Sequence, residues 1–222
     1  MFDRKIILSI DTSTLSLNLS LLLYNGKEEV FSSSKEIKNH ASHLPMAIEE
    51  LLKRGRILLK DLDAISVVSG PGSFTGLRVG IATALGLKCG LKIPLYSISS
   101  LSALALNSNK EGSGIALIDA RRGEFYSQCF KREKEVLTAY GEPFTLKYKT
   151  VKDLTSNLDW GIALIPDTSL NLEFPSKIEV FRNLNLAEIA SKESLKRLLN
   201  GDKGEDLINP IYVRDADAVI QM

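Results

Sequence analysis

One short pattern occurs twice in the chain, and it limits the possible folds more than any other feature. "ILSIDTS" near the start and "ALIDARR" past the middle are both apolar runs that end in an aspartate, Asp11 and Asp119. A nearly continuous apolar run of this length is typical of a buried strand. Each run is followed by segments in which apolar and polar residues alternate, as they do in a half-buried β-strand. The sequence therefore predicts an internal duplication of one unit.

The first copy is predicted to begin with three antiparallel strands at 5–10, 16–24 and 27–34. Asn25-Gly26 between the second and third is a strong hairpin signal, because both positions tolerate positive φ. Helical spacing at 44–54, a buried strand at 62–69, a helix from Gly72 to Cys89, a strand at 93–98 and a helix at 99–108 follow. The predicted order is βββαβαβα.

The second copy repeats this order in shorter form. The range 114–133 is expected to contain a strand that ends at Asp119, a turn and a second strand. A third strand at 135–147, a short helix near 151–158, strands near 161–166 and 178–181, and a helix near 186–199 follow. We therefore divide the chain into an N-terminal subdomain, 1–108, and a shorter, more divergent C-terminal subdomain, 109–222. This α/β plan of two βββαβα-type subdomains resembles the actin-like (ASKHA) ATPases, in which a ribonuclease H-like unit is duplicated.

Composition excludes several classes of protein. A net charge of +1 gives no strong attraction to nucleic acid or membrane. The chain has two cysteines, Cys89 and Cys129, which are far apart in the sequence. The sequence therefore favours neither a disulfide framework nor a zinc site. The apolar run before Asp11 is too short for a signal peptide, and no run reaches the length of a membrane span. These features predict a cytoplasmic protein.

The segment "SVVSGPGSFTGLRVG", residues 66–80, has the look of a phosphate-binding turn but fits no nucleotide template. A dinucleotide fingerprint would need glycine where Thr75 stands, and the glycine comes one place later, at Gly76. A P-loop would need lysine after Gly76, where Leu77 is found. A turn that opens onto a helix can still hold an anion through free N–H groups.

The helix that follows contains an unusual number of glycines. Gly76, Gly80 and Gly90 fall near one line with Thr83 and Leu87 at 100° per residue. Each helix-interior glycine costs about 1 kcal/mol relative to alanine, so a close tertiary contact must offset the cost. The contact is either with the chain's own sheet or with a partner's helix. In the second case, Ile81 and Leu85 on the opposite side would face the sheet.

Other chemistries have weaker support in the sequence. A two-metal nuclease would need a carboxylate after the fourth strand, where Ser69-Gly70 stands. His40 and His43 have no evident third metal ligand. No G-x-S-x-G motif marks a nucleophilic serine. Two turns resemble a degenerate nucleotide site in which bulky arginine replaces glycine, and the candidate residues are Asp11, Thr12, Ser13, Asp119 and Arg121.

Several segments together resemble the TsaB (YeaZ) family, the bacterial partners of TsaD in making threonylcarbamoyladenosine in tRNA. They are "SGPGSFTGLRVGIATALGL", "ILSIDTS", the entry from His40 to Leu44, "LIDARRGEFY" and "PIYVR", in family order. The resemblance covers nearly the whole chain. It implies an actin-like fold and a non-catalytic paralogue of TsaD, whose metal-binding H-x-x-x-H motif is missing here.

The resemblance also implies how such a chain works. It would bind and activate a TsaD-like catalytic subunit, joined by a TsaE-like ATPase. The complex would transfer threonylcarbamoyl to adenosine 37 of tRNAs that read codons starting with A. The chain would meet tRNA only through the complex, and alone it would form a homodimer through the same surface. The predicted interface comprises His40, Leu44, Ser73, Phe74, Gly76, Leu77, Gly80, Thr83 and Leu87.

The same interpretation predicts neither catalytic nor metal-binding residues and no resident cofactor. Weak nucleotide binding, by this chain or at the partner interface, is the one ligand interaction left open. Two alternative functions remain at this stage, a metal-dependent endopeptidase-like activity and an autonomous ATPase activity.

Overall fold

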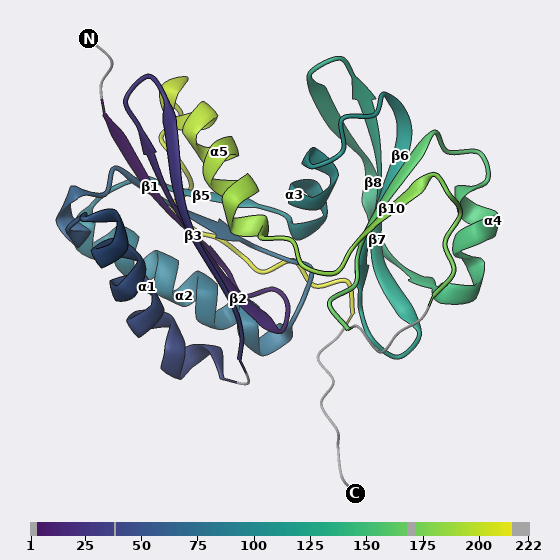
Figure 1. Ribbon diagram of the computed structural model, residues 1–222, viewed down its shortest axis with the longest axis horizontal. Coiled ribbons are helices and arrows are strands. Elements are labelled where there is room, and N and C mark those ends of the chain that lie inside the picture. The colour runs from purple at the N-terminus through teal and green to yellow at the C-terminus, as the bar shows by residue number, and fades with distance from the viewer. Residues whose placement is uncertain (1–3, 38, 168–171, 215–222) are drawn as a thin grey trace, which may run out of the picture.

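Two five-stranded sheets stand side by side in the computed structural model, each with its own helices (Figure 1). The structure describes residues 4–37, 39–167 and 172–214. The first sheet contains β1 (Lys5–Asp11), β2 (Ser16–Tyr24), β3 (Glu28–Glu36), β4 (Ala64–Val68) and β5 (Leu95–Ile98). The second contains β6 (Gly112–Asp119), β7 (Glu124–Glu133), β8 (Val136–Lys147), β9 (Trp160–Leu164) and β10 (Ile178–Phe181).

The strand orders show that the second sheet repeats the first. They are β3-β2-β1-β4-β5 and β10-β9-β6-β7-β8, so β6 takes the place of β1. β1 pairs antiparallel with β2 and parallel with β4, and β6 pairs in the same ways with β7 and β9. The predicted duplicated ribonuclease H-like, actin-like plan is confirmed, and Asp11 and Asp119 occupy equivalent strand ends.

Each sheet has helices on both of its faces (Figure 1). The helices are α1 (His40–Gly55), α2 (Phe74–Leu91), α3 (Ser100–Leu106), α4 (Val151–Thr155) and α5 (Leu186–Leu199). α1 and α2 lie on one face of the first sheet and α5 on the other. α1 begins four residues earlier than the sequence predicts, since the Asn39 side chain accepts a hydrogen bond from the Ser42 amide as N-cap.

The two halves exchange their helices, which the division at residue 108 does not anticipate. α3 comes from the first half but packs on the second sheet, where Leu101 and Leu104 join Trp160 in one apolar cluster. α5 comes from the second half but packs on β1, β2 and β4. Residue 108 therefore separates the two sheets, while each packing unit contains a helix from the other half.

Small polar side chains make the contact between α5 and the first sheet. The Ser194 hydroxyl donates to Ser66 on β4 over 2.8 Å, and Ser191 lies 3.2 Å from Ser20 on β2. Buried hydroxyls that pair with one another avoid the penalty of an unmade hydrogen bond. Short side chains also bring the helix backbone close to the sheet.

The chain after α5 returns to the first subdomain as a strap, residues 200–214. Its Ile208 is 5% exposed and belongs to the apolar core of the first subdomain. The amide of Ile211 donates to the carbonyl oxygen of Ser69 over 2.8 Å. Within the described ranges, no helix is long and apolar enough to cross a membrane.

Candidate functional site

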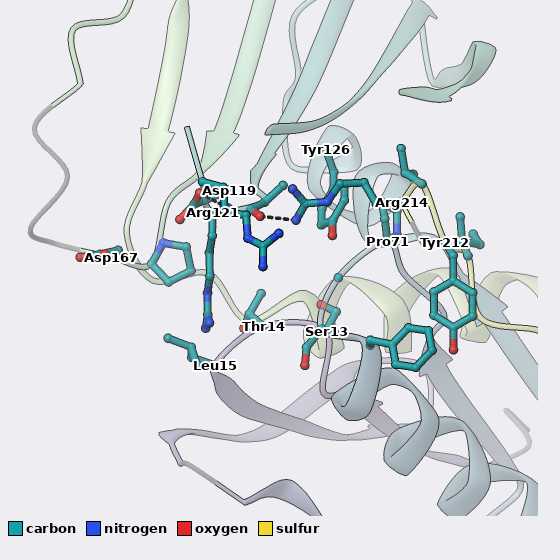
Figure 2. A pocket seen from close by; sticks show the side chains of 18 of the residues that line it. Ser13, Thr14, Leu15, Pro71, Asp119, Arg121, Tyr126, Asp167, Tyr212 and Arg214 are labelled. Atoms are coloured by element: carbon teal, nitrogen blue, oxygen red, sulfur yellow. Dashed lines mark hydrogen bonds between the residues drawn. The ribbon is translucent and has the colours of Figure 1, made fainter. Parts of the chain in front are cut away.

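A cavity of about 770 Å³ lies between the subdomains, where β1 and β6 end (Figure 2). Four segments supply most of its lining: residues 13–15 after β1, residues 71–74 at the start of α2, residues 119–123 in the β6–β7 turn, and residues 211–214 of the strap. Tyr126, Tyr148, Pro166 and Asp167 complete the lining. This is the cavity in which the sequence analysis places a degenerate nucleotide site, and it brings three of the five candidates together.

Asp11 does not reach this cavity. Its carboxylate is fully buried and accepts hydrogen bonds from the Ser13 amide at 2.9 Å and the Asn18 side-chain amide at 3.0 Å. Burial raises the pKa of Asp11 above its ordinary value, against the opposing effect of these bonds. Thr12 is also buried, so of the three residues predicted in the first loop only Ser13 lines the cavity. Asp11 therefore stabilises the loop from inside.

Asp119, the counterpart of Asp11, does line the cavity but is engaged in local contacts. Its Oδ1 accepts a bond from the amide of Arg121 at 2.8 Å and a short one from the hydroxyl of Tyr148. Burial and the neighbouring carboxylate raise the pKa of Tyr148 well above its usual range, so the phenol remains the donor. Asp119 thus holds the turn and Tyr148 in place.

The β6–β7 turn has an unusual backbone. Arg121, Arg122 and Gly123 have φ values of 61°, 55° and 77°, and the amide of Glu124 donates to the carbonyl oxygen of Arg121 over 3.1 Å. Residues with a Cβ rarely adopt this left-handed region. From the turn, the Arg121 side chain extends across the cavity toward Thr14 and Leu15 (Figure 2).

The strap closes one side of the cavity through two anchors. Arg214 donates to the carbonyl oxygen of Ala120 over 2.7 Å and pairs with Glu124 at 3.1 Å. Tyr212 stacks on Phe74, with ring centroids 4.7 Å apart. The Arg78 guanidinium lies 3.8 Å from the centroid of Phe74, and its Nε donates to the Tyr212 hydroxyl over 3.0 Å. The strap therefore joins the β6–β7 turn to the first turn of α2.

The glycines of α2 fall into two groups. A Cβ at Gly76 would strike the carbonyl oxygen of Thr12, and one at Gly80 would strike the Thr12 hydroxyl. Added Cβ atoms at Gly86 and Gly90 would meet no atom within 4 Å. Of the two contacts that the sequence left open, Gly76 and Gly80 therefore make the one within the chain, on its own first loop, and Gly90 does not share it. Ile81 shares that buried side with Gly80 instead of lying opposite it.

The predicted interface residues are consequently dispersed. Leu44, Gly76, Leu77 and Gly80 are buried inside the subdomain, and His40, Phe74, Thr83 and Leu87 are half-buried. Ser73 is exposed as the N-cap of α2, where its hydroxyl accepts from the Gly76 amide over 3.2 Å. The exposed side of α2 carries Thr75, Ala82, Gly86, Cys89 and Gly90, with the larger Arg78 between Thr75 and Ala82. The sequence analysis missed this side, although its small residues recur at helical spacing.

The two histidines lie at the start of α1. His43 Nδ1 is 2.8 Å from the carbonyl oxygen of Asn39, which is a helix-entry contact. His40 is half-buried, and its positive form would lower the pKa of Asp11. Among the described residues, no three histidine, cysteine or acidic side chains come together as metal ligands.

Comparisons with known proteins connect this architecture to tRNA modification. Residues 31–154 match the family model TsaD, described as tRNA N6-adenosine threonylcarbamoyltransferase. The chain is 37% identical over 141 residues to the tRNA threonylcarbamoyladenosine biosynthesis protein TsaB of Haemophilus influenzae, a match that covers 62% of this chain and 58% of that protein. It is 30% identical over 183 residues to TsaB of Buchnera aphidicola, with 80% and 81% covered.

Solved structures extend the likeness in fold over almost the whole chain. YeaZ from Pseudomonas aeruginosa superimposes with a TM-score of 0.73 at 26% sequence identity, covering 94% of this chain and 99% of that one. The match to the Haemophilus protein spans a little over half of that protein's length, whereas the structural match is nearly complete.

Proposed function

The chain belongs to the TsaB family, and from this premise we propose that it is the non-catalytic subunit of a tRNA threonylcarbamoyladenosine transferase. It binds and activates a TsaD-type catalytic subunit, which transfers threonylcarbamoyl to adenosine 37 of tRNAs reading codons that start with A. The names of its relatives and the match to the TsaD family model support this role.

The state of the two strand-end aspartates is the observation that supports a non-catalytic role. Asp11 is closed off from the cavity by burial, and Asp119 is occupied by Arg121 and Tyr148. An enzyme that hydrolyses a metal-bound nucleotide in this cavity needs carboxylates that can face the metal. The described residues offer no observation that favours the alternative ATPase or the endopeptidase-like activity.

The exposed side of α2 is the surface that we assign to the partner. Gly86 lies in the interior of this helix and costs about 1 kcal/mol relative to alanine. Among the described residues no contact offsets that cost, because a Cβ added at Gly86 would meet no atom within 4 Å. A closely approaching partner would supply the reason for glycine. Thr75, Ala82 and Cys89 on the same side are small enough to allow such an approach.

Further partners follow from the same premise. We infer that the exposed side of α2 forms a homodimer when the chain is alone, and that a TsaE-like ATPase joins the heterodimer. A chain with a net charge of +1 has little general attraction to RNA, so tRNA is recruited mainly by the complex. Both cysteines are free thiols, which suits a reducing cytoplasm.

Mixing the purified chain with its cognate TsaD-type protein tests the proposal. We expect a stable complex by size-exclusion chromatography with mass measurement, and threonylcarbamoylation of tRNA that depends on this chain. Gly86→Leu should weaken the complex, while Lys192→Leu on the exposed side of α5 should not. Failure of two folded wild-type proteins to associate would refute the proposed role.

A further inference from the structure

Arginine and aromatic side chains lie together along a strip that leads out of the cavity onto α2. We call this strip the aromatic–arginine track, and its members are Arg121, Arg122, Tyr126, Tyr212, Phe74 and Arg78. The first five line the cavity (Figure 2). Arg78 lies one helical turn beyond Phe74 on the exposed surface of α2. The track is therefore longer than the cavity.

Two arginines of the track, Arg121 and Arg78, carry positive charge that no described carboxylate neutralises. In the described part of the chain, neither Arg121 nor Arg78 forms an ion pair, whereas Arg214 beside them is paired with Glu124. Two carboxylates, Asp119 and Asp167, also line the cavity, and Asp119 is occupied by the Arg121 amide and Tyr148. A phosphate group is the natural counterpart of such an arginine, because it accepts charge-assisted hydrogen bonds from a planar guanidinium.

The aromatic rings offer a stacking surface beside these charges. Phe74 is covered by Arg78 and Tyr212, but Tyr212 itself remains 40% exposed at the mouth of the cavity. Proteins that bind single-stranded nucleic acid combine a basic path for the backbone with rings on which bases stack. A track of this kind suits an extended ligand with several phosphates and bases more than a compact one.

The backbone of the β6–β7 turn adds a further argument. Arg121 and Arg122 both hold positive φ, at which asparagine or glycine would be less strained. Strained backbone of this kind is found at functional sites, although Arg56, Lys92 and Lys134 also hold positive φ in this chain. The turn places Arg121 across the cavity toward Thr14 and Leu15, where a bound chain would pass (Figure 2).

We propose that the aromatic–arginine track binds a single-stranded segment of RNA, with arginines on its phosphates and a base stacked on Tyr212. The proposal deepens the proposed function, since the RNA would be the tRNA that the complex modifies. Under this proposal the chain itself contacts the RNA within the complex. Alone, the chain binds such RNA weakly and in a salt-dependent way.

Fluorescence anisotropy with a labelled single-stranded oligoribonucleotide tests the charges, using the full chain at low salt. Arg121→Gln should weaken binding several-fold and reduce the slope of log affinity against log salt by about 0.7. Arg56→Gln is the matched control, because Arg56 is also exposed and has a φ of 55° on another surface. Equal losses in the two variants would overturn the proposal.

Two substitutions at one position test the stacking. Tyr212→Ala removes the ring and should weaken binding by roughly tenfold. Tyr212→Phe keeps the ring and removes only the hydroxyl that accepts from Arg78, so its binding should stay near wild type. Since the phenylalanine variant also keeps the packing on Phe74, equal weakening in both variants would contradict stacking.

Competition separates the proposal from a nucleotide pocket and from the proposed function. Unlabelled single-stranded RNA should displace the probe, and a duplex of the same sequence or ADP with Mg²⁺ should not; displacement by either would overturn the proposal. Arg121→Gln should still bind the TsaD-type partner. If the wild-type chain binds that partner but track substitutions leave RNA binding unchanged, the track proposal fails and the proposed function stands. If the wild-type chain binds RNA through the track but does not bind the TsaD-type partner, the proposed function fails and the track proposal stands.

Discussion

Thr12 donates a hydrogen bond from its hydroxyl to the carbonyl oxygen of Gly76 over 2.8 Å, joining residues 64 positions apart. The same hydroxyl fills the space in which a Cβ of Gly80 would stand. The first loop and the start of α2 are therefore one packed unit. This contact explains why Gly76 and Gly80 are glycines, whereas no described residue of the chain explains the glycine at position 86.

The two groups of glycines should respond oppositely to the same substitution. Gly80→Ala forces the Cβ into Thr12 and should lower the free energy of unfolding by about 1–3 kcal/mol, as overpacking does. Gly86→Ala should raise it by about 1 kcal/mol, because alanine is the better helix former and the space is open. Urea denaturation measures the free energy of unfolding of both variants. If the two substitutions change it in the same direction, the glycines of α2 do not fall into two groups.

The cysteines report on the exposed side of α2 without any substitution. Cys89 is exposed on that side, whereas Cys129 is half-buried and burial raises the pKa of its thiol. A thiol reagent should modify Cys89 first, since the thiolate is the reactive form. In complex with the TsaD-type partner, Cys89 should become protected. Unchanged labelling of Cys89 in a formed complex would place the interface elsewhere.

The strain in the β6–β7 turn predicts a stabilising substitution. Arg121 has a φ of 61°, which asparagine tolerates better than arginine. Arg121→Asn should raise the free energy of unfolding by about 0.5–1 kcal/mol, and so should Arg56→Asn at its φ of 55°. Only the first should weaken RNA binding. A stability gain without a loss of RNA affinity at Arg121 would show that this arginine has no such role.

Local sequence patterns predict much of the fold. They do not predict the features that depend on which face of a helix packs on which sheet. The apolar runs before Asp11 and Asp119 and the Asn25-Gly26 turn predict the antiparallel strands that open each half, whereas they do not predict the order of strands within the sheets. The position of α5 could not be predicted, because it meets the first sheet through serines and alanines rather than a strong apolar stripe. The sequence of the strap has no helical or strand periodicity, so its position on the first subdomain can be known only from its contacts in the structure.

The candidate site shows the same limit. Helical spacing correctly groups Gly76 with Gly80, but spacing alone does not say whether that side faces the sheet or a partner. The sequence likewise places Asp11 at a strand end, whereas its burial depends on Asn18 from the neighbouring strand. Arg121 could be assigned to the cavity because it directly follows the second strand end.

Asp11 should make stability depend on pH in a defined direction. Burial raises the pKa of Asp11 in the folded chain, so its contribution to stability is complete below the pKa of the unfolded chain and is lost as pH rises through the folded value. Asp11→Asn removes this dependence. The stability of the variant relative to wild type should therefore improve as pH rises from about 4 toward neutrality. Urea unfolding across this range measures it, and a constant difference would argue against a raised pKa.

The strap should contribute to the stability of the first subdomain although it has no regular structure. Ile208 is 5% exposed in the core of that subdomain, and the adjacent Leu207 is 69% exposed. Ile208→Ala should lower the free energy of unfolding by about 2–4 kcal/mol, as a buried large-to-small change does. Leu207→Ala should change it by less than about 0.5 kcal/mol. If both variants unfold at the same urea concentration, the strap is not part of the folded core, and its anchoring of Tyr212 at the cavity would lose its support.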